Sequence, residues 1–184
     1  MKKTVLILAC VVTSIAHADT SVNLIKNGKF DPSQAGWHTN EFIRIEKDEA
    51  RGNVLVLRNT RDKSVKSTQG IKREPEWAKL KFSYWVNVPS ITPGSGGHQH
   101  ARFTVTMIDA NHHRTDVAKE DKQTWHLLAG AWKEPTDGWV RVEEVIDIPS
   151  EVVTSIIVGP AIFDADGEMR VADLTVEAVE KEVQ

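Results

Sequence analysis

Alternating hydrophobic and polar positions are the dominant pattern of this chain. In residues 80–88 apolar side chains occupy every second position, and polar ones such as Lys81, Ser83 and Asn87 stand between them. Side chains of a β-strand point alternately to its two faces, so this period of two is typical of a strand with one buried face. We expect the core face of this strand to carry Leu80, Phe82, Tyr84, Val86 and Val88.

The same period recurs in residues 102–107 and 153–163, whereas helical periodicity is almost absent. Clusters of Gly, Asn and Asp, which favour tight turns, separate these segments. About ten short antiparallel strands separated in this way predict an all-β fold, a two-sheet β-sandwich of the jelly-roll type. The expected hairpin turns are residues 50–53, 109–111 and 164–167.

The first eighteen residues have the features of an export signal. A basic start at Lys2 and Lys3 precedes an apolar run over residues 4–15, which is too short to span a bilayer, and the small residues Ala16 and Ala18 form a cleavage site. We expect residues 1–18 to be removed after Ala18. The product, residues 19–184, would be a single domain, secreted or periplasmic, without a membrane anchor.

Two other processing routes remain open. Acylation of Cys10 would make a lipoprotein, although the apolar run before it, about four residues, is shorter than the roughly 7 to 15 that a signal core needs. Cleavage after Ala16 would instead leave His17 as the first residue. An N-terminal His can chelate copper through its amine and its ring.

Charge and cysteine content narrow the classes of function. The chain has 23 basic and 26 acidic side chains, a formal net charge of −3, and loss of the signal removes two of the lysines. This balance argues against nucleic acid or anionic lipid as a partner. Cys10, the single cysteine, leaves with the signal. The mature chain therefore has no disulfide and no thiol chemistry.

Four short motifs together resemble one known family. Their positions are residues 23–31 followed by Trp37, residues 80–86, residues 139–149 with the spacing W-x-x-V-x-x-x-I-x-I-P, and residues 171–176. In this order the chain resembles the carbohydrate-binding modules appended to bacterial cellulases, xylanases and laminarinases. The resemblance implies a galactose-binding-domain-like jelly roll in which residues 23–31 and 171–176 are strands of one sandwich. It also implies reversible, non-catalytic binding of a polysaccharide or oligosaccharide.

The aromatic residues are the first candidates for contact with a sugar. Six Trp stand against one Tyr, and a flat indole suits the apolar face of a pyranose while polar neighbours bond its hydroxyls. Trp85 and Asn87 face away from the expected core, and Arg102 and Thr104 would lie beside them if the two strands pair. Core packing is the alternative for each Trp. The candidate ligand-binding residues are Trp85, Asn87, Arg102, Thr104, His98, Gln99, His100, Trp125 and Trp132.

The histidines allow a second interpretation. His98 and His100 would place two imidazoles on one side of an extended chain, and His112 and His113 follow the next strand. A transition-metal site could use them with a carboxylate, but no further ligand stands at a diagnostic spacing. Polar loops often carry His without a special role, and hydrogen bonding of His98, Gln99 or His100 to sugar hydroxyls is the preferred functional alternative to a metal site.

The acidic residues do not predict an enzyme. Glycosidases on similar sandwiches project two carboxylates into one groove, whereas Glu144 and Asp147 stand three positions apart and point to opposite faces of a strand. We therefore expect no catalysis. The alternatives are a β-sandwich hydrolase or lyase that acts on polysaccharide, and a structural or adhesive envelope protein without a glycan ligand.

The resemblance also implies a structural calcium ion between the first strand and the last. Asp31 and Asp173 stand at acidic positions of the family pattern. Asp173 matches the second closing Asp of that pattern, Ala172 replaces the first closing Asp, and Lys29 stands where an acid is frequent. Each change removes an oxygen donor of the kind that calcium prefers.

Overall fold

The computed structural model describes residues 22–60, 63–112, 127–148 and 151–181. In these ranges the chain forms ten strands and no helix, and none of the described residues therefore belongs to a helix that could cross a membrane. Every strand pairing is antiparallel. The strands are β1 (Ile43–Asp48), β2 (Gly52–Asn59), β3 (Ser64–Lys66), β4 (Gln69–Lys72), β5 (Trp77–Thr92), β6 (Ala101–Asp109), β7 (Leu127–Trp132), β8 (Val140–Asp147), β9 (Val153–Phe163) and β10 (Asp166–Glu180).

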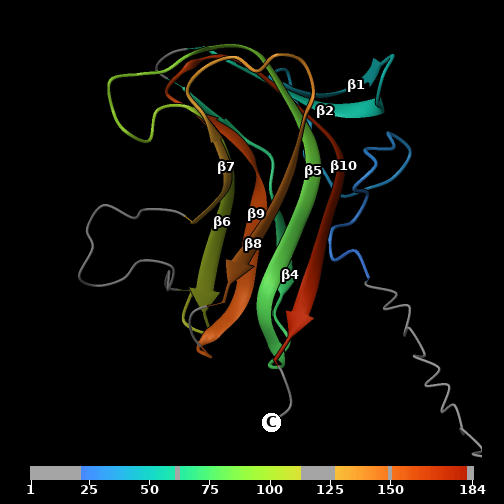
Figure 1. Ribbon diagram of the computed structural model, residues 1–184, viewed down its shortest axis with the longest axis vertical. Coiled ribbons are helices and arrows are strands. Elements are labelled where there is room, and N and C mark those ends of the chain that lie inside the picture. Colours follow the sequence, from blue (N-terminus) through green and yellow to red (C-terminus); the bar gives the residue numbers. More distant parts are fainter. Residues whose placement is uncertain (1–21, 61–62, 113–126, 149–150, 182–184) are drawn as a thin grey trace, which may run out of the picture.

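The strands form two five-stranded layers. One sheet has the order β1-β2-β10-β5-β8, and the other has the order β3-β9-β6-β7, with β4 also paired to β9. Figure 1 shows β5 and β10 of the first sheet on one side and β6, β7 and β9 of the second on the other. The predicted all-β sandwich is confirmed.

The core lies between the two sheets, where the alternation of β5 places its apolar side chains. Leu80, Phe82, Tyr84, Val86 and Val88 are all fully buried, as the sequence predicts. The ring of Phe103 from β6 meets them from the other sheet: its centroid lies 4.7 Å from that of Tyr84 and 6.0 Å from that of Phe82. The Tyr84 hydroxyl donates a 2.6 Å hydrogen bond to the carbonyl of Ala129 on β7.

Residues 23–31 are not a strand, which corrects the expectation from the family pattern. The chain turns there, with positive φ angles at Asn27 (53°) and Phe30 (52°), and a ladder cannot continue through such a turn. The side chain of Asn23 replaces part of the ladder: its amide donates to the Leu174 carbonyl and its oxygen accepts the Val176 N–H. Residues 171–176 belong to β10 and are a strand, as expected.

The turns predicted from the sequence gave only some of the strand connections correctly. Residues 50–53 do form the β1–β2 hairpin, in which Asp48 pairs with Gly52. Residues 164–167, however, lead from β9 to β10, which lie in opposite sheets. A short turn rich in Asp and Gly allows either outcome, so the local sequence cannot distinguish a hairpin from a crossing between layers.

Candidate functional site

The structure separates residues that we expected to form one ligand site. Trp85 and Asn87 lie on β5, which pairs with β10 and β8, whereas Arg102 and Thr104 lie on β6 in the other sheet. The two strands do not pair, so the condition for placing Arg102 and Thr104 beside Trp85 is not met. The chain crosses between layers in residues 93–100, so Arg102 and Thr104 do not flank Trp85.

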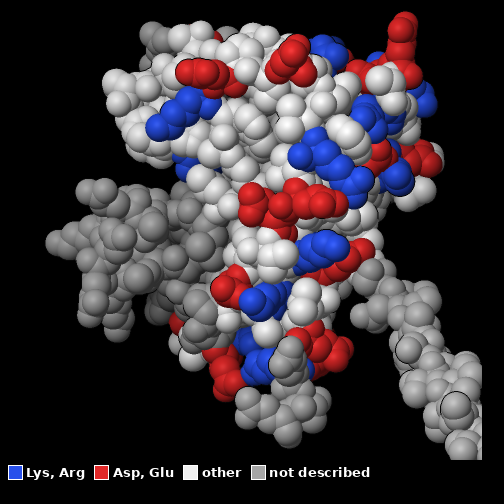
Figure 2. All heavy atoms as spheres, in the orientation of Figure 1, with Lys and Arg blue, Asp and Glu red and all other residues white. Residues whose placement is uncertain are grey.

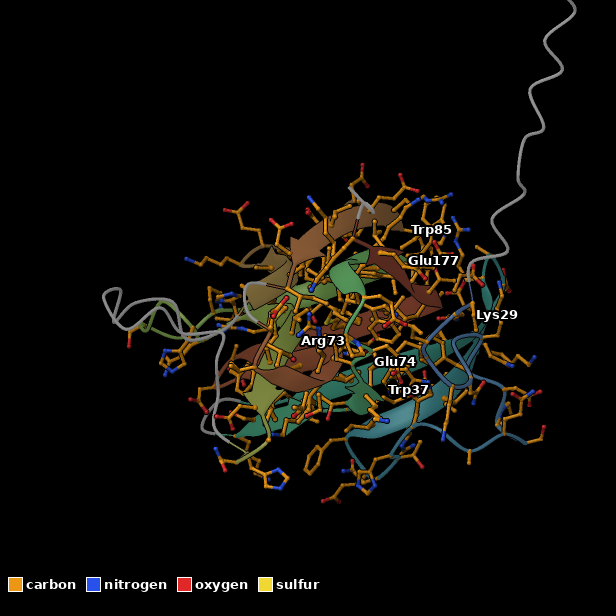
Figure 3. All side chains as sticks on the ribbon, turned by 90° about the horizontal axis from the view of Figure 1, so that it is seen from below. Lys29, Trp37, Arg73, Glu74, Trp85 and Glu177 are labelled. Atoms are coloured by element: carbon orange, nitrogen blue, oxygen red, sulfur yellow. The ribbon has the colours of Figure 1, made fainter. Side chains whose placement is uncertain are left out.

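Trp85 is half-buried on the outer face of its sheet rather than freely exposed (Figure 3). It packs with Trp139 against a small outer cluster of Val54, Val56 and Ala172, which are nearly inaccessible to solvent. The guanidinium carbon of Arg51 lies 3.4 Å from the centroid of the indole. A sugar ring could stack on that face of Trp85 only after displacing Arg51.

Gln99 organises the loop between β5 and β6. Its side-chain oxygen accepts the N–H of Gly96 at 2.7 Å, and its backbone carbonyl accepts the N–H of Gly94. A Cβ on Gly94 would lie 2.8 Å from the backbone carbonyl oxygen of Asp164, which cannot easily move, so a glycine suits this position. His98, next to Gln99, is exposed.

His100 and Arg102 form a buried polar pair at the start of β6, with exposed fractions of only 4% and 3%. Arg102 Nη2 donates to the His98 carbonyl and lies 3.4 Å from His100 Nδ1, and the guanidinium lies 5.2 Å from the centroid of the Phe163 ring. Arg102 Nε and His100 Nε2 are buried without a hydrogen-bond partner. Burial first, and then the positive charges of Arg102, Lys133 and His98, lower the pKa of His100 to about 4.

The other predicted ligand residues have varied positions. Thr104 is buried and donates from its hydroxyl to the carbonyl of Gly159. Trp132 is half-buried and turned to the core, where its ring meets Tyr84 edge-on at 6.4 Å. Gly130 makes room for it, because a Cβ there would lie 2.4 Å from the Trp132 ring. Trp125 and residues 1–18, the expected export signal, lie outside the described residues.

The two candidate calcium ligands already have partners. Asp173 Oδ1 accepts a hydrogen bond from the Lys29 ammonium, with 2.7 Å between Oδ1 and Nζ (Lys29 is labelled in Figure 3). Asp31 accepts the N–H and the hydroxyl of Ser33 and the amide of Gln34, and these hydrogen bonds lower its pKa. Calcium would need Lys29 to leave Asp173, so calcium binding stays a prediction. Within the part of the chain that the structure describes, no three His, Cys, Asp or Glu side chains gather as metal ligands.

Sequence reasoning missed a groove on one side of the sandwich. Two hollows of about 390 and 440 Å³ adjoin there and share Asn40 and Ile43. We call them together the edge groove, because they lie along β1 and β3, each an edge strand of its sheet. The first hollow is lined by Asn40, Phe42, Ile43, Asn59, Lys63, Ser64, Val65 and Lys66. The second is lined by Pro32, Gln34, Trp37, Thr39, Asn40, Ile43, Arg44 and Ile45.

Local hydrogen bonds fix the walls of the edge groove. Asn40 Oδ1 accepts the N–H groups of Phe42 and Ile43 at 2.7 and 2.9 Å, which sets the turn before β1. Trp37 Nε1 donates to the Asn27 carbonyl at 2.9 Å. The Asn59 amide donates to the carbonyls of Lys63 and Ala165. These bonds hold the half-buried rings of Trp37 and Phe42 in place.

The lining of the edge groove combines aromatic, amide and cationic side chains. The volume of the groove is typical of small-molecule sites, which combine apolar surface with a few polar groups. The Trp37 and Phe42 rings add apolar surface, and Lys63 Nζ lies 4.9 Å from the centroid of the Phe42 ring. Gln34, Asn40 and Asn59 add amide groups that are partly engaged within the protein. Arg44, Lys63 and Lys66 add positive charge. Among the described residues, no Asp or Glu lines either hollow. No feature of the sequence pattern connects these residues, because three separate segments meet only in the fold.

Comparison with known proteins supports the fold. No family model and no curated protein matches this sequence. The CBM22-1 xylan-binding domain of Paenibacillus barcinonensis Xyn10C is similar with a TM-score of 0.57 and 12% identity, over 88% of this chain and 97% of that domain. The C-terminal family 22 carbohydrate-binding module of Clostridium thermocellum Xyn10B gives a TM-score of 0.55 and 11% identity, over 90% and 99% of the two chains.

A third similar structure belongs to a much larger protein. The enzymatically active domain of tailspike protein 4 from bacteriophage CBA120 gives a TM-score of 0.60 and 9% identity over 85% of this chain, but this chain spans only 21% of that one. The fold is thus the jelly roll of carbohydrate-binding modules. At these identities the likeness concerns architecture alone.

Proposed function

We propose that this protein is an exported, non-catalytic glycan-binding protein that holds its ligand reversibly in the edge groove. The observation that carries the proposal is the meeting of two aromatic rings, Trp37 and Phe42, with amide and cationic side chains in adjoining hollows. Sugar rings need apolar surface for their C–H faces and directional partners for their hydroxyls. The groove offers both.

The similar solved structures also support this function. The matched domains from Xyn10C and Xyn10B are a xylan-binding domain and a carbohydrate-binding module, and this chain spans nearly all of each. The lack of an acidic residue along both hollows, in the described part of the chain, favours binding over hydrolysis, because glycosidases need a pair of carboxylates at the bond they cleave.

Two assays on one panel of polysaccharides test the proposal. Pull-down on insoluble polysaccharides, or titration with soluble ones, should detect binding to at least one polymer. A reducing-sugar assay on the same panel should show no release of new ends. Release of reducing ends would favour a hydrolase or a lyase, because both cleavages leave a new reducing end, and an unsaturated sugar at the other end would identify the lyase. If no polysaccharide is bound and none is cleaved, a structural or adhesive protein without a glycan ligand would be favoured.

A further inference from the structure

The charged side chains that line the edge groove all carry the same sign. They are Arg44, Lys63 and Lys66, and all three are exposed, so a ligand can reach them from solvent. The chain as a whole is acidic, with a formal charge of −3. On the face shown in Figure 2 basic and acidic side chains are interleaved. The groove is therefore a local concentration of positive charge on an acidic protein.

Two of these cations have no carboxylate partner. Lys63 and Lys66 both line the first hollow, which we call the Phe42 hollow after its aromatic ring. Lys29 at the surface pairs with Asp173, whereas Lys63 and Lys66 form no ion pair with any described residue. An unpaired ammonium in an open hollow can take its counter-ion from a ligand.

Two acidic residues stand close to the Phe42 hollow without lining it. Asp164 Oδ1 accepts the Ser64 hydroxyl at 3.0 Å, and Glu41 precedes Phe42 in the chain. In the part of the chain that the structure describes, neither forms a salt bridge with a lysine of the hollow. Their charge reduces the positive potential of the hollow but leaves both ammonium groups unpaired.

Lys63 reaches across the groove to the aromatic ring. Its carbonyl accepts the Asn59 amide at 2.7 Å and the Asp164 N–H at 2.8 Å, which fixes the backbone just before β3. Its Nζ lies 4.9 Å from the centroid of the Phe42 ring, which stands just before β1 in the other sheet. A cation over an aromatic face is attracted by the negative charge of the π-system. The ammonium of Lys63 thus covers one face of the Phe42 ring.

This cover distinguishes charged sugars from neutral ones. A neutral sugar that stacks on that face must displace the ammonium and gives it no new partner of opposite charge. An anionic sugar gives the displaced ammonium an acidic group to pair with, and Lys66 in the same hollow adds a second positive charge. The Phe42 hollow should therefore select for negative charge.

We propose that the glycan is anionic and that one of its charged sugar residues stacks on Phe42, with its acidic group held between Lys63 and Lys66. This inference rests on the proposed function and names the ligand class of the same site. The acidic group is a carboxylate, as in a uronic acid, or a sulfate ester, since a lysine ammonium binds either one as a point charge. Neighbouring sugar residues extend into the adjoining second hollow beside Trp37.

The most direct test changes only the charge of the ligand. Polygalacturonate is compared with its carboxyl-reduced form, and dextran sulfate with dextran, by titration at low and at high salt. We expect the charged member of at least one pair to bind at least tenfold more tightly at low salt, and this advantage to shrink as salt screens the ion pairs. A preference in the first pair alone identifies a carboxylate, and one in the second alone identifies a sulfate. A preference in both pairs shows that the hollow accepts either group.

Two results would contradict the inference in different ways. If a polysaccharide of the panel binds but neither pair shows a preference for its charged member, the ligand is not anionic and the proposed function remains intact. If no polysaccharide binds, the inference and the proposed function are both overturned.

Variants locate the acidic group. Lys63→Gln and Lys66→Gln should each lower the affinity for the preferred charged polymer about fivefold, as loss of an exposed charge pair does. Lys63→Gln should not weaken binding of the neutral polymer, because it also uncovers the Phe42 ring. Both side chains are exposed, so both variants should fold, which melting curves check. If one variant does not fold, the other still carries the test.

Lys72→Gln is the matched control, because Lys72 is exposed and lines neither hollow. Lys66 pairs with Ala161 of β9 and Lys72 with Ser155, six residues away along the strand, so the two lysines stand roughly 20 Å apart. Lys72→Gln should bind the charged polymer like wild type. Wild-type affinity in both groove variants, or an equal loss in Lys72→Gln, would overturn the assigned position.

Discussion

Lys29 Nζ lies 2.7 Å from Asp173 Oδ1 and joins the N-terminal segment to the last strand. The ammonium supplies a positive charge where the family pattern implies calcium. An exposed pair of this kind contributes at most about 1 kcal/mol. Its main consequence is that calcium must compete with a tethered cation for Asp173.

We therefore expect Lys29→Ser to increase the response to calcium. Saturation about 100-fold above Kd would stabilise the fold by about 2.7 kcal/mol and raise the melting temperature by several degrees, and the wild type should shift less than the variant. Melting curves with calcium and with chelator measure this, and Lys26→Ser, an exposed lysine of the same segment, is the control. Coincident curves for both proteins would show that Asp31 and Asp173 hold no calcium.

Trp85→Ala should destabilise the fold, although Trp85 lies outside the core. The side chain packs over Val54, Val56 and Ala172, and its removal exposes their apolar surface to water. A loss of about 2 kcal/mol, part of what a fully buried Trp contributes, corresponds to a fall in melting temperature of about 4–8 °C. Arg51→Ala, which removes only the stacked cation, should cost about 1 kcal/mol or less. Equal melting curves for wild type and Trp85→Ala would contradict this packing role.

His100 should make the protein less stable in mild acid. Its pKa is about 4 in the fold, whereas a His pKa in an unfolded chain is about 6.5. The unfolded chain therefore binds the proton first, so the stability present above about pH 6.5 falls as the pH drops towards 4, by up to about 3 kcal/mol. Denaturant titrations at several pH values should show a shallower fall for His100→Asn than for wild type. The control is His112→Asn, at an exposed His, and a His100→Asn profile as steep as that of the control would refute the assignment.

The exported product should begin at Asp19 and carry no lipid. The motive is the cleavage site formed by Ala16 and Ala18, together with the short apolar run before Cys10. Intact-mass measurement on the secreted or periplasmic protein tests this. A diacylglycerol group on Cys10 would make it a lipoprotein, and a chain that starts at His17 would bring copper chelation back into consideration.

The alternation of apolar and polar residues predicted the core strands correctly, because it depends only on the local sequence. The burial of Leu80, Phe82 and Tyr84 follows from the period of two alone. The assignment of strands to sheets is not local. Arg102 would be a neighbour of Trp85 if their two strands paired, but the loop at residues 93–100 carries the chain from one layer to the other.

The edge groove could not be read from the sequence for a related reason. Phe42, Asn59 and Lys66 stand in three segments with no shared motif, and they meet because β1 and β3 are edges of facing sheets. Only Trp37 was part of a recognisable pattern, because it follows residues 23–31 in the motif that resembles the family. The motif predicts that Trp37 is part of the sandwich, but it does not predict that Trp37 lies beside a hollow.

One titration tests the central claim most directly, that glycan binds in the edge groove. Phe42→Leu keeps an apolar side chain against the core but removes the flat ring, so its melting temperature should stay close to that of wild type. Its affinity for the best polysaccharide of the panel should fall about tenfold, while Trp85→Ala should bind like wild type. Normal binding by folded Phe42→Leu, with binding lost in folded Trp85→Ala, would contradict the account and place the ligand on the outer face of the other sheet.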